Sequence, residues 1–321
     1  MIEEIWKNSS SVSEVALKKG SNSTELLLHA DTGSGQMVFY TLFPGIYLSF
    51  IRTNALAWPE PDTNTQLHPL LINYCISGRS ELLLEDTTYI YIKEKDISIS
   101  RQSAQKEYIF PTKHYEGIKL YFDEELLKAE SERLLGQFGI DFKALEKIYC
   151  TTGNTYIAQT QPEAELILNK IWTLFDRPSL FYMQIYVLEL LTTLSKQALC
   201  RPTPYAFYTE IQVRAAKKAE QIVTGDIRKH YPIKKLAAQF SISETSLKNY
   251  FRGVYGQTIS SYLRELRMKT ASKLLSETKL PISEISAQVG YTNQGKFAAV
   301  FKKRFHLSPL EYRRFQNLEK Y

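Results

Sequence analysis

Two stretches near the C-terminus carry the same pattern about fifty residues apart. The first, PIKKLAAQFSISETSLKNYFRGVYGQTISSYLRE, spans 232–265, and the second, PISEISAQVGYTNQGKFAAVFKKRFHLSPLEYRRF, spans 281–315. A repeat of two short helices around a tight turn is the sequence form of a helix-turn-helix, here present as a tandem pair. When the two copies are superposed, three aromatic positions coincide: Phe251 with Phe301, Tyr255 with Phe305, and Tyr262 with Tyr312.

The first unit, 232–254, has an apolar stripe that ends at Phe240. Ser243 is then placed to cap a second helix over 244–254, on which Leu247 and Phe251 face inward. The side chains left outward have the length and polarity to reach base edges and phosphates in a major groove. They are Thr245, Lys248, Asn249 and Arg252.

The second unit, 281–304, repeats this plan. Gly290 takes the turn, where a positive φ is required, and Thr292 is predicted to cap the next helix. Between the units we predict a helix over 259–276, which at 1.5 Å per residue spans roughly 27 Å. Such a spacer sets two recognition helices about one turn of DNA apart. Ser308-Pro309-Leu310-Glu311 predicts a capping box that begins the last helix.

The basic residues are concentrated in the same region. Residues 201–321 hold 22 Lys and Arg against 9 Asp and Glu, a balance of +13, whereas residues 1–200 hold the other 18 and 25, a balance of −7. Because duplex DNA is a dense line of phosphate charge, this segregation predicts that the C-terminal third binds nucleic acid. The repeat disfavours the alternative, a solvated basic face without a ligand.

The composition excludes several other classes. The most apolar stretch, 180–194, is interrupted by Gln184 and Glu189, so we expect no membrane helix. The N-terminus, MIEEIWKNSSS, lacks the basic and apolar regions of a signal peptide. The three cysteines have neither metal-ligand spacing nor a disulfide framework, which favours a location in the reducing cytoplasm. They are Cys75, Cys150 and Cys200.

From about Gly35 to Phe122 the pattern is that of strands. Short segments rich in Ile, Leu and Tyr alternate in part and are bounded by glycine or charged turns, and Gly78-Arg79-Ser80 is predicted as one hairpin turn. Their spacing of about eight to twelve residues predicts a β-sandwich or a small barrel.

After Asp123 the period becomes helical. The segment 180–199, LFYMQIYVLELLTTLSKQAL, is apolar on most of its circumference, so it must be buried on more than one side. It either packs into its own domain or pairs with a second copy of the chain. Arg201-Pro202-Thr203-Pro204 predicts an extended linker, because the two prolines disfavour helix.

The C-terminal third resembles the DNA-binding domain of AraC/XylS-type bacterial transcription regulators. The residues that carry the resemblance are PISEISAQVGYTNQGKFAAVFKKRFHLSPLEYRR and the preceding LRELRMKTASKLLSETKLPI, which matches the family's linker helix. The rest of the chain is similar in layout, with a cupin-like β domain for effector binding followed by helices for dimerisation. The resemblance implies a transcription activator whose partners are double-stranded DNA, a small-molecule effector, RNA polymerase and a second copy of the chain.

The resemblance also assigns residues in the two recognition helices. Base contacts fall on Thr245, Lys248 and Asn249, and then on Gln294, Gly295, Lys296 and Ala299; phosphate contacts fall on Arg252, Lys302, Lys303 and Arg304. Gly295 stands where the family usually has serine, and Ala298-Ala299 replaces a more polar pair, so the second helix is predicted to act mainly as a phosphate clamp. His306 replaces the usual glycine after Phe305, so a helix end must tolerate a side chain near the left-handed region.

The β domain supplies candidate effector contacts among its polar and aromatic side chains: Tyr47, Arg52, Trp58, Tyr74, Arg79 and Tyr91. The alternatives are a regulator that binds DNA constitutively, an architectural DNA binder, and a catalytic cupin fused to a DNA-binding domain. Against the cupin enzyme, the five histidines, at 29, 68, 114, 230 and 306, do not cluster as metal ligands do. We therefore predict no catalytic residues, no metal and no cofactor.

These patterns together predict a multidomain α+β protein. Its N-terminal part would be a cupin-like β-barrel or sandwich with a helical dimerisation segment, and its C-terminal part an all-α tandem helix-turn-helix domain. The predicted boundaries are 1–122 for the regulatory β domain, 123–200 for the helical segment, 201–208 for the linker and 209–321 for the DNA-binding domain.

Overall fold

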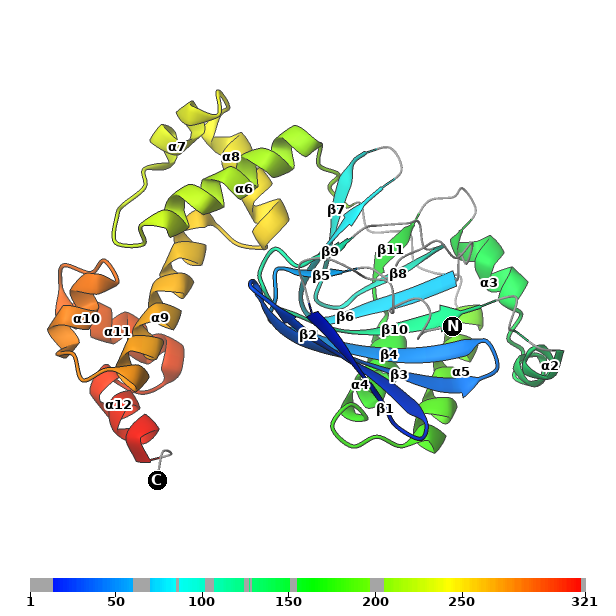
Figure 1. The fold of residues 1–321 in the computed structure, drawn as a ribbon. Helices are drawn as coiled ribbons and strands as arrows, with labels where there is room; N and C mark the ends of the chain where they lie inside the picture. The colour runs from blue at the N-terminus through cyan, green and yellow to red at the C-terminus, as the bar shows by residue number, and fades with distance from the viewer. Residues whose placement is uncertain are drawn as a thin grey trace. The chain divides into compact units, whose positions relative to one another are not determined.

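The computed structural model describes residues 14–59, 70–84, 87–101, 107–123, 127, 129–150, 155–196 and 205–318. The prolines of the predicted linker, Pro202 and Pro204, lie outside the described residues. The chain divides into two compact units between Thr209 and Glu210 (Figure 1). None of the described helices is long and apolar enough to cross a membrane.

The N-terminal unit is built on a curled antiparallel sheet. Its strands are β1 (Glu14–Lys19), β2 (Ser23–Ala30), β3 (Gly33–Phe43), β4 (Ile46–Thr53), β5 (Ala57–Pro59), β6 (Leu70–Leu83), β7 (Tyr89–Lys93), β8 (Asp96–Arg101), β9 (Glu107–Ile109), β10 (Tyr115–Phe122) and β11 (Tyr156–Gln159). Along the sheet the strands follow the order β1-β2-β3-β4-β10-β6-β8-β11, while β5 pairs with β9, and both β7 and β9 pair with β6. The β-rich part therefore begins earlier than the sequence pattern indicates.

The predicted hairpin turn at Gly78 is wrong, because β6 runs straight through it. Gly78 has a φ of 87°, and a Cβ there would lie 2.1 Å from the carbonyl oxygen of His114. The pairing of β6 with β10 shifts register just before this point, since Glu116 pairs with Ser77 but Gly117 pairs with Cys75. Before Gly78 the strand pairs with β10 and β8, and after it with β7 and β9. The bulge of β6 thus lies at Ile76, and Gly78 marks the point beyond which the strand changes partners.

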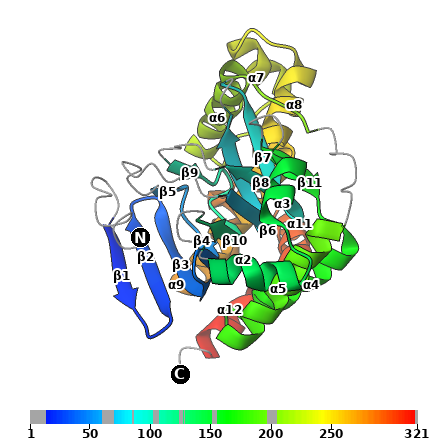
Figure 2. The same cartoon turned by 90° about the vertical axis from the view of Figure 1, so that its right-hand side faces the viewer.

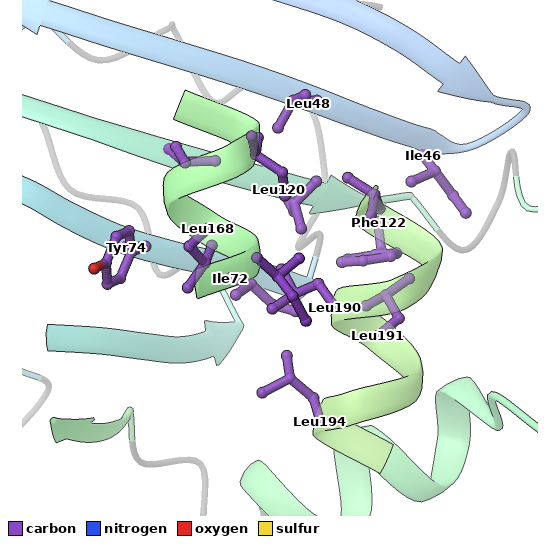
Figure 3. Close-up of a cluster of buried hydrophobic side chains, with 14 of the residues drawn as sticks. Ile46, Leu48, Ile72, Tyr74, Leu120, Phe122, Leu168, Leu190, Leu191 and Leu194 are labelled. Carbon is purple, nitrogen blue, oxygen red and sulfur yellow. The ribbon is translucent and has the colours of Figure 1, made fainter. Parts of the chain in front are cut away.

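Helices cover one face of this sheet. They are α2 (Ala129–Gln137), α3 (Phe142–Tyr149), α4 (Pro162–Thr173) and α5 (Leu180–Lys196). Helices α4 and α5 lie side by side (Figures 1 and 2). Figure 3 shows Leu168 of α4 and Leu190 and Leu191 of α5 among buried side chains of the strands. The strand residues labelled there are Ile46, Leu48, Ile72, Tyr74, Leu120 and Phe122.

Helix α5 divides its apolar surface in two. Met183, Val187 and Leu190 are fully buried in the unit's own core, whereas Phe181 and Tyr182 are 65% and 49% exposed. Of the two alternatives left open by the sequence, packing within the domain accounts for the buried residues. The exposed residues leave a strip of apolar surface on the same helix.

A second core lies on the other face of the sheet, and the chain segment that leads to the C-terminal unit packs against it. Tyr205 contacts this core. Tyr208 exchanges two backbone hydrogen bonds with Tyr89 of β7, at N···O distances of 2.7 and 2.9 Å. The Tyr208 ring lies 5.9 Å from that of Tyr91. The described residues 205–208 therefore belong structurally to the N-terminal unit.

The C-terminal unit is all helical. Its helices are α6 (Glu210–Gly225), α7 (Ile233–Gln239), α8 (Glu244–Tyr255), α9 (Ile259–Glu277), α10 (Ile282–Gln288), α11 (Gln294–Phe305) and α12 (Pro309–Leu318). The predicted fold class, a β-rich N-terminal part with a helical segment and an all-α C-terminal part, is confirmed.

The sequence repeat is also a repeat of geometry. Phe251 lies 4.6 Å from Tyr255 and 5.6 Å from Tyr262, ring centroid to ring centroid. The corresponding distances from Phe301, to Phe305 and to Tyr312, are 4.5 and 5.4 Å. Each helix-turn-helix unit thus places the same aromatic triad between its second helix and the helix that follows.

Candidate nucleic-acid interface

The first helix-turn-helix consists of α7 and α8. Leu236 and Ala237 of α7 are buried, as is Leu247 of α8. Ser241 forms the turn with a φ of 54°, and the Ser243 side chain accepts a hydrogen bond from the backbone N–H of Ser246 at 3.0 Å. The predicted cap of this recognition helix is therefore confirmed, and the inward face of α8 is fixed by the packing of its apolar side chains.

The polar face of α8 is open to solvent. All four side chains predicted to contact DNA in this unit are exposed: Thr245, Lys248, Asn249 and Arg252. Lys248 lies 3.9 Å from Glu244, one turn earlier on the helix. Because both side chains are exposed, such a pair is weak and is readily exchanged for a phosphate.

The second helix-turn-helix consists of α10 and α11, and its cap differs from the prediction. Gly290 forms the turn with a φ of 81°, as predicted. The cap of α11 is Asn293, whose Oδ1 accepts from the backbone N–H of Lys296 at 2.8 Å, so the prediction of Thr292 is wrong by one residue. Thr and Asn are both good caps, so residue type does not distinguish Thr292 from Asn293. The cap is whichever of the two directly precedes the first helical residue.

The residues predicted to contact DNA in α11 are all exposed: Gln294, Gly295, Lys296, Ala299, Lys302, Lys303 and Arg304. Arg304 differs from the others, because its guanidinium makes hydrogen bonds of 2.8 to 3.0 Å with both carboxylate oxygens of Glu265 on α9. This bond lowers the pKa of Glu265. A phosphate contact by Arg304 would have to share the guanidinium with Glu265.

The relative position of the two recognition helices is held by the loop between α6 and α7. Arg267 of α9 donates to the carbonyl oxygens of Ile227 and Lys229 at 2.6 and 2.9 Å. A hydrogen bond from Arg228 lowers the pKa of Asp226 from 3.8 to about 2, so the carboxylate of this loop's ion pair stays charged even in moderately acidic solution. A methyl group on Gly290 would lie 2.7 Å from the Cα of Arg228, so the turn of the second unit touches this loop directly.

The candidate effector residues of the N-terminal unit do not converge on one place. Tyr74 belongs to the core beneath α4 and α5, whereas Trp58 belongs to the core on the other face. Arg52 lies 4.3 Å from the centroid of the Phe175 ring, beyond the end of α4. The structure brings together only one pair of the six, Arg79 and Tyr91, with the guanidinium carbon 5.9 Å from the ring centroid. Tyr47 is half-buried on β4.

The sequence reasoning missed a set of buried polar side chains within the strands. They are Ser49, Asn73, Ser98 and Lys119, each no more than 5% exposed. Each stands between neighbours that are Ile, Leu, Tyr or Phe, which in sequence is the pattern of a strand with one solvent-facing side. No local signal therefore distinguishes them from exposed residues, and only the packing of the sheet's second face buries them.

Comparison with known proteins identifies the C-terminal unit. The family model described as a helix-turn-helix domain matches residues 236–314. The HTH-type transcriptional activator RhaR of Enterobacter sp. (strain 638) is 31% identical over 91 residues, which are 28% of this chain and 32% of that protein. The lactose operon transcription activator of Staphylococcus xylosus is 30% identical over 128 residues, 40% of this chain and 45% of that protein. The matches therefore span less than half the length of these curated relatives.

A solved structure is also similar to part of this chain. It is the C-terminal domain of AraT, a response regulator from Geobacillus stearothermophilus, with 30% identity and a TM-score of 0.30. The match covers 33% of this chain and 86% of that one.

Proposed function

Since the chain belongs, by its C-terminal helix-turn-helix domain, to the AraC/XylS family, we propose that it is a sequence-specific DNA-binding transcription regulator. It acts as an activator that responds to a small molecule bound by the N-terminal unit and that contacts RNA polymerase at its promoters. It works in the cytoplasm, and the proposal gives it no enzymatic activity, metal or cofactor. The relatives named as activators support this direction of control.

The observation that carries the proposal is the pair of exposed recognition helices, α8 and α11. Helix α8 packs through Phe251, and helix α11 packs through Phe297 and Phe301. All three side chains are 0% exposed, while the polar residues of both helices face solvent. Helices presented in this way enter successive major grooves when their spacing is fixed. The excess of basic residues in the same unit supplies attraction to the phosphates.

Helix α8 is expected to make mainly base contacts, and helix α11 mainly phosphate contacts. Lys248→Ala or Asn249→Ala should cost about 1–3 kcal/mol at the target site and relax the sequence preference, because base-edge contacts carry the discrimination. Lys302→Ala or Lys303→Ala should weaken binding by similar factors on all sequences. Mobility-shift titrations against the target and a scrambled duplex measure both. If the two pairs of variants change target and scrambled binding alike, the orientation of the recognition helices is wrong.

The exposed strip on α5 supports a homodimer. Phe181 and Ile185 are 65% and 41% exposed, and the rings of Tyr182 and Tyr186 lie 5.8 Å apart along the same helix. A second copy of the chain would bury this strip, and pairing would raise affinity for paired DNA sites through effective concentration.

A charged substitution in the strip is expected to separate the dimer without unfolding it. Residues 1–209 expressed alone should sediment as a dimer at micromolar concentration, and Ile185→Glu should sediment as a monomer. Phe138→Glu is the matched control, because Phe138 is 47% exposed but lies outside α5. A monomeric parent fragment would contradict the proposed dimer, as would an equal response of both variants.

A further inference from the structure

The connection from α6 into α7 is a stretch of the chain that carries positive charge only. Residues 227–243 contain no acidic residue but four basic ones, all of them exposed: Arg228, Lys229, Lys234 and Lys235. We call residues 227–235, which hold all four, the basic loop. Asp226 directly precedes it and lies 2.9 Å from Arg228 and 3.6 Å from Lys229. One carboxylate thus faces two of the four cations, and the surface of the loop stays positive.

The second helix-turn-helix does not repeat this surface. In the superposed repeat Lys234 and Lys235 correspond to Ser283 and Glu284. The first turn of α10 contains the acidic Glu284, whereas the first turn of α7 contains no acidic residue. Because the start of a helix carries partial positive charge, an acidic side chain stabilises it and lysines destabilise it. The first unit therefore keeps two lysines where they lower its stability, which points to a role other than folding.

The basic loop lies between the two helix-turn-helix units. It leads directly into α7 of the first unit (Figure 1). It also abuts the turn of the second unit, since a methyl group on Gly290 would lie 2.7 Å from the Cα of Arg228. Gly290 stands three residues before Asn293, which caps the recognition helix α11. The loop thus reaches from the first unit to the start of the second recognition helix.

Hydrogen bonds fix the conformation of the loop. The Asp226 carboxylate accepts from Nε and Nη2 of Arg228 at 2.9 and 3.1 Å, and the Asp226 carbonyl oxygen accepts from the Tyr231 hydroxyl at 2.9 Å. Arg267 of the spacer helix α9 donates to two carbonyl oxygens of the loop. A charged surface that is already ordered loses little conformational freedom when it binds a partner.

The position and the charge of the loop fit one partner. Recognition helices that enter successive major grooves leave a stretch of phosphate backbone between them. A basic surface between the two helices faces that stretch, and lysine side chains are common donors to phosphate oxygens. Such contacts add affinity on every sequence and do not discriminate between bases.

We propose that the basic loop is a third DNA-contacting surface, in which Lys229, Lys234 and Lys235 bind the phosphates between the two segments read by α8 and α11. This inference rests on the proposed function, because it adds a contact to the same DNA complex. The two recognition helices and the loop then hold the DNA at three places along one face.

The test uses the full-length protein and a duplex that this protein selects from a random library, with the protected region mapped by footprinting. The double variant Lys234→Ala/Lys235→Ala should lower the slope of log affinity against log salt by about two units, one for each lost phosphate contact. Neutral methylphosphonates in place of the central phosphates should weaken binding of the parent protein about 10-fold, as expected for loss of one charge-assisted contact. They should weaken binding of the double variant less than about 2-fold, because its lysines no longer meet these phosphates.

Lys269→Ala/Lys273→Ala is the matched control. Both lysines are exposed on α9, and at about 100° per residue they lie on the side of that helix away from Arg267, which holds the loop. This control should keep the parent's salt slope and its response to methylphosphonates. The loop variant should melt at the same temperature as the parent or higher, since two lysines leave the start of α7. If it melts lower, the two single variants replace it, each with an expected slope change of about one unit.

Three outcomes would overturn the inference: an unchanged salt slope in the loop variants, an equal loss of affinity by parent and loop variant on the neutralised duplex, or an equal slope change in the control. Each of these outcomes leaves DNA binding intact and contradicts the inference alone. A full-length protein that selects no duplex contradicts the proposed function.

Discussion

Binding of the C-terminal unit to a single-site DNA duplex is expected to fall about 1,000-fold when the salt concentration rises from 50 to 200 mM. The exposed basic side chains of the recognition helices, among them Lys248, Lys302 and Lys303, would each displace condensed cations from the phosphates. With about six such contacts the logarithm of affinity falls steeply and linearly with the logarithm of salt. Fluorescence anisotropy with residues 210–321 and a labelled duplex measures the slope.

The same titration separates two kinds of residue. Lys303→Ala should lower the slope of log affinity against log salt by about one unit, the change expected for one lost phosphate contact. Asn249→Ala should weaken binding at every salt concentration and leave this slope unchanged. Arg304→Ala is expected to change the slope less than Lys303→Ala, because Arg304 is already paired with Glu265. Affinity that hardly depends on salt would contradict the electrostatic basis of the interface.

Gly290→Ala is expected to destabilise the C-terminal unit by about 2–5 kcal/mol. The residue has a φ of 81°, which an alanine adopts only with strain, and the new methyl carbon would lie 2.7 and 2.8 Å from backbone atoms of Arg228. Left-handed strain and an overpacked contact together account for a loss of this size. Urea unfolding of the C-terminal unit measures the free energy, and DNA titration of the folded fraction measures the affinity.

Gly225→Ala is the matched control for this change. Gly225 ends helix α6, and a methyl group there would meet nothing within 4 Å. Its replacement should be neutral or stabilise the unit by up to about 1 kcal/mol, since alanine is the better helix former. If Gly290→Ala unfolds at the same urea concentration as Gly225→Ala, the turn of the second unit does not hold the loop between α6 and α7.

The DNA-binding unit could be predicted well because its determinants are local. Caps, turns and helix periods depend on residues a few positions apart, and the repeat supplied each of them twice. His306 ends α11 with a φ of 62°. This left-handed conformation was expected, because His306 stands at the position where a glycine usually ends the helix. The Ser308 and Glu311 capping box forms as predicted, with the Ser308 N–H bonded to Glu311 at 2.8 Å. The one-residue error at Thr292 shows the limit of such signals, since adjacent residues can serve the same purpose.

The β-rich unit was less predictable because its determinants are not local. Gly78 looks the same in sequence whether it forms a hairpin turn or lies inside a long strand, and only the pairing of β6 with strands far along the chain distinguishes the two. Residue type alone does not indicate on which face of the sheet a side chain lies, and the effector candidates lie on both faces, Tyr74 on one and Trp58 on the other. Ser49 and Lys119 are 70 positions apart in sequence and became neighbours only through the register of β4 with β10.

The pairing of Tyr208 with Tyr89 has a consequence for how the two halves can be separated. Only Thr209 lies between this pairing and the first residue of α6. A cut at residue 200, just before the proline segment, would remove Tyr205 from the core and Tyr208 from its pairing with β7, and would bare the backbone N–H and carbonyl of Tyr89. An uncovered strand edge recruits other chains, so a fragment ending at 200 would aggregate through β7. A fragment that ends at residue 209 keeps Tyr208 paired with Tyr89, so this part of the β7 edge stays covered.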